Sequence, residues 1–97
     1  MKYELERTSE FDDWLGNLKD KVARKAIVKR LIRLEAGNFG DCKPVGGKVS
    51  ELRFFIGPGY RVYYSIIGDK LVLLLLAGTK GSQQKDIKTA KELLENY

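Results

Sequence analysis

The 97-residue sequence contains no histidine, a single cysteine and two prolines. Without histidine, acid–base chemistry must use other side chains, and a common zinc ligand is missing. The single cysteine, Cys42, excludes an internal disulfide and suggests a reducing compartment. Because no histidine is available to activate its thiol, Cys42 is not expected to be a catalytic nucleophile.

Other motifs are absent as well. The sequence has no P-loop, no dinucleotide fingerprint and no carboxylate cluster with metal-ligand spacing. The N-terminal residues lack the apolar run of a signal peptide, and the longest apolar run, residues 71–77, is too short for a membrane-spanning helix. These absences predict a cytoplasmic protein that uses no metal and no cofactor.

The composition is that of one small globular domain, covering residues 1–97. The formal net charge is +5, and the sequence pI is near 9.4. Such a charge fits a polyanionic partner or an acidic protein, although many domains are mildly basic without either.

Periodicity and turn residues predict an α+β fold with the order β-α-α-β-β-β-α, in which a small, mostly antiparallel sheet packs on helices. Ser9, Asp20 and Ser82 are expected to cap the helices, and Gly37 to end the second one. The last strand is apolar on both faces and should be interior. The expected strands are residues 2–7, 49–56, 60–67 and 70–77, the helices are residues 9–18, 20–36 and 82–95, and residues 40–48 form a loop.

The stretch from residue 51 to residue 64 predicts a β-hairpin around Gly57-Pro58-Gly59, with one arginine in each arm. If Ile56 pairs with Tyr60, alternation along the strands separates two faces. The core face carries Leu52, Phe54, Val62, Tyr64 and Ile66. The other face carries Glu51, Arg53, Phe55, Arg61, Tyr63 and Ser65.

Two interpretations of the arginine face are open. It can be a solvated surface on which Glu51 pairs with the arginines. Alternatively, Arg53 and Arg61 bind phosphates while Phe55 and Tyr63 supply stacking surfaces for bases. We favour the second interpretation, because the two arginines alternate with aromatic residues on paired strands.

The third hairpin strand should add Leu74, Leu76 and Gly78 to the arginine face. It leads into the N-terminus of the last helix, where backbone N–H groups attract anions. Lys80 then supplies a third cation beside the two arginines. The same helix start also carries Ser82, Gln83, Gln84 and Lys85.

The second helix has a basic stripe at i, i+4 spacing. The simplest interpretation is a solvated helix face. The alternative is contact with an acidic partner segment or with the rRNA backbone. Arg24 and Arg30 widen the basic surface. The stripe consists of Lys21, Lys25, Lys29 and Arg33.

Several segments together resemble the HigB-type, phage-derived Gp49-like branch of the RelE/ParE toxin superfamily. They are FDDWLGNLKD, RLEAGNFGDCKPVGGKVSELR, GPGYRVYY and LLLAGTKGSQQKDI, in this order over nearly the whole chain. The resemblance implies a RelE-like fold and the toxin half of a type II toxin–antitoxin (addiction) module. Many relatives are metal-independent endoribonucleases that cut mRNA at the ribosome and are silenced by a helix-turn-helix antitoxin.

The resemblance also implies roles for individual residues. Arg61 would contact the scissile phosphate, with Arg53 and Lys80 assisting. RNA contacts are expected from Phe55, Lys48, Gln83, Gln84 and Lys85.

Cleavage would start with attack of a 2′-OH on the adjacent phosphate. Relatives often use a histidine or tyrosine near the last helix for proton transfer, but here the chain has no histidine and Ile87 occupies that region. Among Lys80, Lys85, Tyr63 and Glu51, we favour Lys80 or Tyr63. Two alternatives remain: a non-enzymatic, ParE-like inhibitor of DNA gyrase, or a nucleic-acid-binding domain without toxicity.

Overall fold

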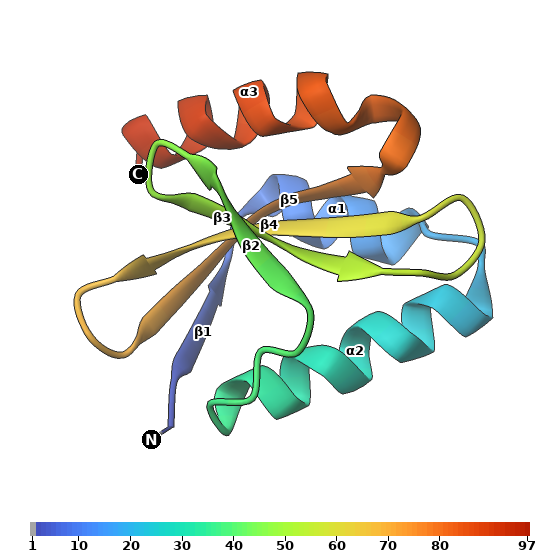
Figure 1. Cartoon of the computed structure of the whole chain (residues 1–97), viewed down its shortest axis with the longest axis horizontal. Coiled ribbons are helices and arrows are strands. Elements are labelled where there is room, and N and C mark those ends of the chain that lie inside the picture. The colour runs from blue at the N-terminus through green and yellow to red at the C-terminus, as the bar shows by residue number, and fades with distance from the viewer. Residues whose placement is uncertain (1) are drawn as a thin grey trace.

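The computed structural model describes residues 2–97 as a five-stranded sheet between helices (Figure 1). The strand order is β1-β5-β4-β3-β2, with β1 parallel to β5 and every other pair antiparallel. The predicted α+β fold is therefore confirmed, and β5 is interior as expected. No helix among residues 2–97 is long and apolar enough to cross a membrane. The elements are β1 (Glu4–Arg7), α1 (Ser9–Asn17), α2 (Lys21–Glu35), β2 (Cys42–Gly46), β3 (Val49–Phe54), β4 (Tyr60–Ile67), β5 (Leu71–Thr79), the 3₁₀ turn η1 (Lys80–Ser82) and α3 (Gln83–Glu95).

Strand β2 corrects the prediction of a loop over residues 40–48. It pairs with β3 at the sheet edge, with a register shift between Pro44 and Gly46. The edge position accommodates a proline, which has no N–H to donate. Most of β2 is exposed, so the strand lacks the alternating pattern that would have revealed it. A tight two-residue turn, Gly47-Lys48, joins β2 to β3, and both residues, like the preceding Gly46, have positive φ.

The β3–β4 register differs from the prediction by two residues. Phe54, not Ile56, pairs with Tyr60, so Arg53 lies opposite Arg61 and Glu51 opposite Tyr63. The loop between Phe54 and Tyr60 is five residues long, and within it the Gly59 N–H donates to the Ile56 carbonyl at 2.9 Å. A shift of two residues leaves every side chain on its predicted face.

An irregularity between β4 and β5 overturns one expected neighbour of the arginines. Arg61 pairs with Gly78 and Tyr63 with Leu76, so Gly78 and Leu76 lie on the arginine face as predicted. The register then shifts, so that Tyr64 pairs with Leu74. Leu74 consequently packs in the core on the opposite face.

The helix starts are partly as predicted. Asp20 caps α2, with its carboxylate 3.0 Å from the Ala23 N–H, and Gly37 follows that helix with φ 92°. Helix α1 is capped by Thr8 rather than Ser9, since the Thr8 hydroxyl accepts the Phe11 N–H at 3.0 Å. Ser82 precedes α3 but makes no side-chain cap bond.

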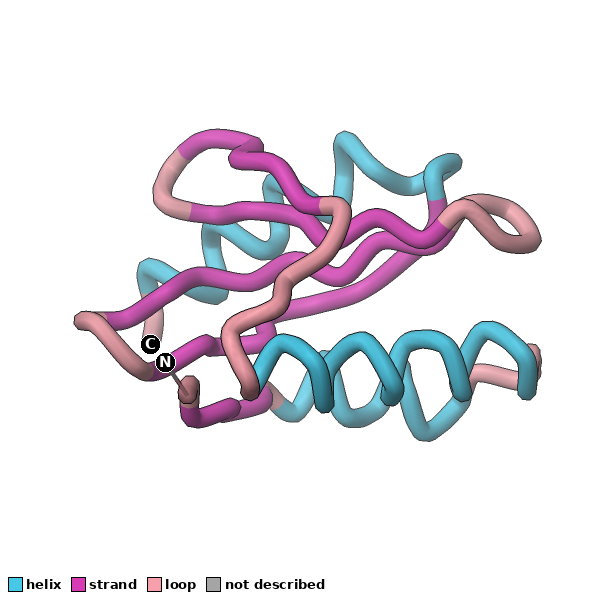
Figure 2. Tube along the Cα trace, turned by 60° about the horizontal axis from the view of Figure 1, so that its bottom comes forward, coloured by secondary structure: helices cyan, strands magenta, loops and turns pink. Residues whose placement is uncertain are grey.

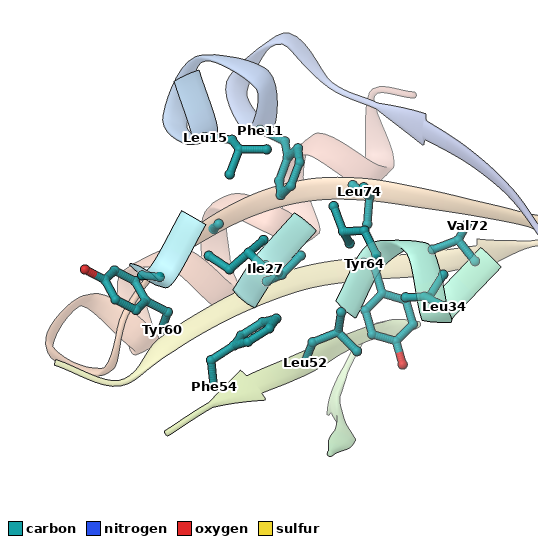
Figure 3. Packing of buried hydrophobic residues seen from close by; sticks show 14 residues of the cluster. Phe11, Leu15, Ile27, Leu34, Leu52, Phe54, Tyr60, Tyr64, Val72 and Leu74 are labelled. Atoms are coloured by element: carbon teal, nitrogen blue, oxygen red, sulfur yellow. The ribbon is translucent and has the colours of Figure 1, made fainter. Parts of the chain in front are cut away.

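The sheet buries a core on each face. Helices α1 and α2 pack on one face and α3 on the other (Figures 1 and 2). Figure 3 shows Phe11 and Leu15 of α1 and Ile27 and Leu34 of α2 meeting strand residues such as Leu52 and Leu74. The α3 core consists of Val49, Tyr63, Leu73, Leu75 and Ala90.

One expected core residue lies outside both cores. Ile66 was predicted on the core face but is 44% exposed. It is the second-to-last residue of β4.

Candidate functional site

Arg53 and Arg61 face each other across β3 and β4. Like charges directly opposite on paired strands repel, so each requires a counter-charge. Asp41 accepts both the Arg53 Nη2 (2.7 Å) and Nε (3.3 Å) hydrogen bonds. The Arg61 Nε lies 3.7 Å from Glu51 Oε1. Both arginines are therefore held in ion pairs, and the predicted Glu51 pairing applies to Arg61.

The Glu51–Arg61 pair is buried, which the sequence did not predict. Glu51 is fully buried and Arg61 is 9% exposed. Gln83, the first residue of α3, donates from Nε2 to Glu51 Oε1 at 3.0 Å. The second carboxylate oxygen, Oε2, has no hydrogen-bond partner among the described residues. Much of the arginine face thus lies beneath α3 instead of forming an open surface.

Gly59 connects the hairpin loop to the start of η1. Its carbonyl accepts the Arg61 Nη1 at 3.1 Å and the Lys80 backbone N–H at 2.7 Å. This shared acceptor brings Lys80 to the same end of the sheet as Arg61, as predicted. The Lys80 side chain is exposed and, like that of Lys85, belongs to no ion pair among residues 2–97.

A hollow of about 610 Å³ lies at the start of α3. Its shape depends on Gly78, because a Cβ there would collide with the Asp86 carboxylate and the Ser82 hydroxyl. That hydroxyl donates to the Asp86 carboxylate at 2.5 Å and accepts the Thr79 backbone N–H at 3.4 Å. The hollow gathers four predicted site residues, and its lining is Lys80, Gly81, Ser82, Gln83, Gln84 and Lys85.

Tyr63 is brought under the site but not to its surface. It is fully buried, and its hydroxyl has no hydrogen-bond partner among the described residues. Burial raises the pKa of Tyr63 far above its usual value, and the charges of Glu51 and Asp86 raise this pKa further. The hydroxyl therefore stays protonated at neutral pH and is shielded from solvent.

Phe55 is the exposed aromatic residue at this end of the hairpin. It is 78% exposed, and the Arg53 guanidinium lies 5.8 Å from its ring centroid. Aromatic side chains are usually stabilised by burial. An exposed Phe55 is therefore available to stack on a base. Phe55 also lines a hollow of about 330 Å³ with Lys29 and Arg33 of α2.

Lys48 is not brought to this site. It lies in the β2–β3 turn, whereas Arg53 and Arg61 lie at the far end of the same strands. In Figure 1 this turn is beside the C-terminal part of α3. The Lys48 carbonyl accepts the Ser65 hydroxyl at 2.7 Å, a bond that fixes the turn.

The basic side chains of α2 divide between structural and exposed positions. Arg30 donates from Nη2 to the Arg53 carbonyl at 3.1 Å and lies 4.4 Å from the Phe54 ring centroid. It thereby fastens α2 to β3. Helix α2 covers the sheet face opposite to α3. The predicted basic stripe is exposed on this helix and consists of Lys21, Lys25, Lys29 and Arg33.

Sequence reasoning missed three partners in this site. Asp41 was assigned to a loop, so its pairing with Arg53 had no sequence signal. Gln83 was expected to contact RNA, whereas it holds a buried carboxylate. Asp86 is four residues after Ser82, a spacing that could have indicated their contact on one helix turn.

Comparison with known proteins defines first a fold and then a family. The E. coli toxin RelE, solved in the free state as a double arginine-to-alanine mutant, superposes with a TM-score of 0.74, covering 95% of this chain and 98% of RelE at 19% identity. The fold is therefore RelE-like. No family model matches the sequence. An uncharacterized protein of Haemophilus influenzae (strain KW20 / Rd) is 45% identical over 95 residues, covering 98% of this chain and 96% of that protein. This chain belongs to the same family as the H. influenzae protein.

Proposed function

We propose that the chain is a single toxin domain of a type II toxin–antitoxin module, of the HigB-type branch, and that it inhibits translation by cutting mRNA at the ribosome without a metal ion. The observation that carries the proposal is the cluster of Arg53, Arg61 and Lys80 at one end of a RelE-like sheet. Three cations at one end of a sheet suit a phosphate whose charge rises during the reaction.

The reaction would be an intramolecular transfer of the phosphoryl group from the 5′-oxygen of the next nucleotide to the 2′-oxygen of the RNA. A 2′-OH gives up its proton and attacks the adjacent phosphorus, and charge accumulates on the phosphoryl oxygens. The bond to the 5′-oxygen then breaks, and this oxygen takes up a proton and leaves as a hydroxyl group. Arg61 is preorganised to stabilise that charge, because Glu51 and the Gly59 carbonyl hold its guanidinium. Removing one such donor typically lowers the rate about 10²–10³-fold.

Lys80 is the group we propose for proton transfer. Among the four candidates, Glu51 and Tyr63 are fully buried, whereas Lys80 and Lys85 are exposed. Lys80 is also tied through its backbone to the carbonyl that Arg61 contacts. Tyr63 is therefore a supporting residue in this proposal.

Substrate binding would extend from the phosphate site in two directions. Phe55 would stack on a base, with Arg53 beside it. Gln84 and Lys85 would contact the RNA from the hollow at the start of α3.

A helix-turn-helix antitoxin is the partner that we propose for the free toxin, and the cytoplasm is the compartment.

Inducible expression with primer-extension mapping of mRNA tests this function. We expect growth arrest and codon-linked mRNA cuts with the unchanged protein. Arg61→Ala and Lys80→Ala should each lower the cutting rate about 10²–10³-fold, and Lys88→Ala, on the exposed side of α3, should have no effect. Lys80→Ala is informative because this residue is exposed and its loss leaves no buried charge unpaired.

Two results would contradict the proposal. An SOS response with intact mRNA would favour the alternative of gyrase inhibition. Unimpaired growth at full expression would favour a nucleic-acid-binding domain without toxicity. Circular dichroism of each purified variant verifies that it is folded.

A further inference from the structure

The outer face of α2 combines exposed apolar side chains with a high positive charge. Val22 is 72% exposed, Val28 is 41% exposed and Ile32 is 61% exposed. These three are half of the six large exposed hydrophobic residues among residues 2–97. Scattered exposed residues are ordinary, but Val28 and Ile32 line one hollow on this helix, and a contiguous apolar patch suits a contact surface.

The charge of the whole protein is concentrated on this helix. Helix α2 contains six basic residues and one acidic residue. The chain has 18 basic and 13 acidic residues, so the remainder carries twelve of each and has no net charge. Basic residues four positions apart repel one another when no anion is bound. An acidic partner would relieve this repulsion.

Helical spacing brings the apolar and basic residues together. Val28 and Ile32 are four positions apart and therefore adjacent on the helix surface. Lys25 and Lys29 flank this pair along the same face. A hollow of about 770 Å³ forms here, lined by Lys21, Arg24, Lys25, Val28, Lys29 and Ile32.

We propose that this face binds an acidic amphipathic helix of a partner protein. The lysines alone would suit RNA phosphates, but Val28 and Ile32 offer nothing to a phosphate backbone. They match the apolar stripe of a helix whose flanks carry glutamate or aspartate. The surface is on the opposite side of the sheet from α3, and of its lining only Lys29 also lines the hollow beside Phe55. The inference therefore goes beyond the proposed RNA site and does not depend on it.

A designed peptide tests the chemistry of this surface directly. The probe is an 18-residue helical peptide with leucines along one stripe and glutamates elsewhere, and a scrambled peptide of equal composition is its control. Titration into the ¹⁵N-labelled full chain should shift amide signals of α2 and leave those of α3 unchanged. The scrambled peptide should bind at least about tenfold more weakly, because it cannot present apolar and acidic groups together.

Paired variants separate the two contributions. Ile32→Gln should weaken peptide binding about tenfold, and the double change Lys25→Glu with Lys29→Glu at least as much. Ile66→Gln is the matched control, since Ile66 is also an exposed isoleucine but lies on β4. Lys80→Ala should bind the peptide normally, which separates this surface from the RNA site.

The proposal is overturned if both peptides bind equally, or if Ile32→Gln and Ile66→Gln behave alike, because binding would then reflect charge only. It is also overturned if neither peptide binds. Finally, a 20-nucleotide single-stranded RNA is titrated into the same sample. Stronger shifts of α2 by the RNA than by the amphipathic peptide would assign this face to RNA.

Discussion

The two faces of the sheet are built from the same strands but have different interiors. On the α1/α2 face, β4 contributes Val62 and Tyr64 to a continuous apolar core. On the α3 face, the same strand contributes Arg61 and Tyr63, and the charged Glu51 lies beside them. Apolar burial is favourable without further conditions, whereas a buried charge is tolerated only when it is paired.

This difference separates stability from binding. The α1/α2 face can hold the sheet together without any polar group at its centre. The α3 face accepts an unfavourable carboxylate, Glu51, whose contacts fix the positions of Arg61 and Gln83. Local rules of good packing are broken most often where a protein binds or reacts. We therefore place the proposed RNA site on the polar face, and the predictions below test this division.

The largest effect is expected from Glu51→Ala. Removing one partner of a buried ion pair leaves Arg61 without its counter-charge and costs about 3–5 kcal/mol of unfolding free energy. Urea denaturation measures this loss. RNA cleavage by the folded fraction should also fall, because the Arg61 guanidinium loses a contact that orients it.

A double change distinguishes pairing from packing at this position. Glu51→Leu with Arg61→Met replaces both charges by apolar side chains of similar size and should recover most of the lost stability. Cleavage should not recover, because Arg61, the proposed phosphate-binding residue, is gone. If Glu51→Ala alone is as stable as the unchanged protein, the ion pair has no structural role and the comparison of the two faces fails.

A somewhat smaller effect is expected on the apolar face. Leu34 is fully buried between α2 and the sheet, and Leu34→Ala should cost about 2–5 kcal/mol. Activity per folded molecule should be unchanged, since no cation of the site contacts Leu34. Val22→Ala on the same helix is the control, because Val22 is 72% exposed and should change stability by less than about 0.5 kcal/mol. A specific loss of cleavage by Leu34→Ala would show that the faces are coupled.

The parts of the fold that follow from side-chain alternation were predictable from the sequence. Arg53, Arg61 and Tyr63 were placed on one face correctly, because alternation along a strand does not depend on the length of the turn. The register was wrong by two residues, since the Gly57-Pro58-Gly59 sequence fits both a three-residue and a five-residue loop. Strand β2 was missed because four of its five residues are exposed.

The partners within the site were not predictable in the same way. Asp41 reaches Arg53 only because β2 adds to the sheet edge. Gln83 reaches Glu51 across 32 residues of sequence, and no local pattern indicates such a contact. The basic stripe of α2 was evident, but the role of Val28 and Ile32 became visible only when the structure left them exposed.

The smallest effect on stability is expected from Tyr63→Phe. The Tyr63 hydroxyl is buried without a hydrogen-bond partner among the described residues, so removing it should change stability at pH 7 by less than about 1 kcal/mol, or increase it. Cleavage should persist, whereas Lys80→Ala should abolish most of it. Loss of cleavage by a folded Tyr63→Phe protein would return the proton-transfer role to Tyr63.

The same variant has a distinct effect at high pH. The folded-state pKa of Tyr63 lies above the unfolded value of about 10, so the unfolded chain loses this proton first as the pH rises. Ionisation of Tyr63 therefore leaves the free energy of unfolding unchanged below about pH 10. At higher pH it lowers this free energy by up to about 1.4 kcal/mol per pH unit. Between pH 7 and pH 11, the free energy of unfolding measured by urea denaturation should therefore fall less for Tyr63→Phe than for the unchanged protein. Burial also raises the pKa of Tyr64. Tyr63→Phe should therefore still lose some stability at pH 11. Equal losses in both proteins would mean that the Tyr63 hydroxyl is open to solvent, and the α3 face would then be accessible where we describe it as closed.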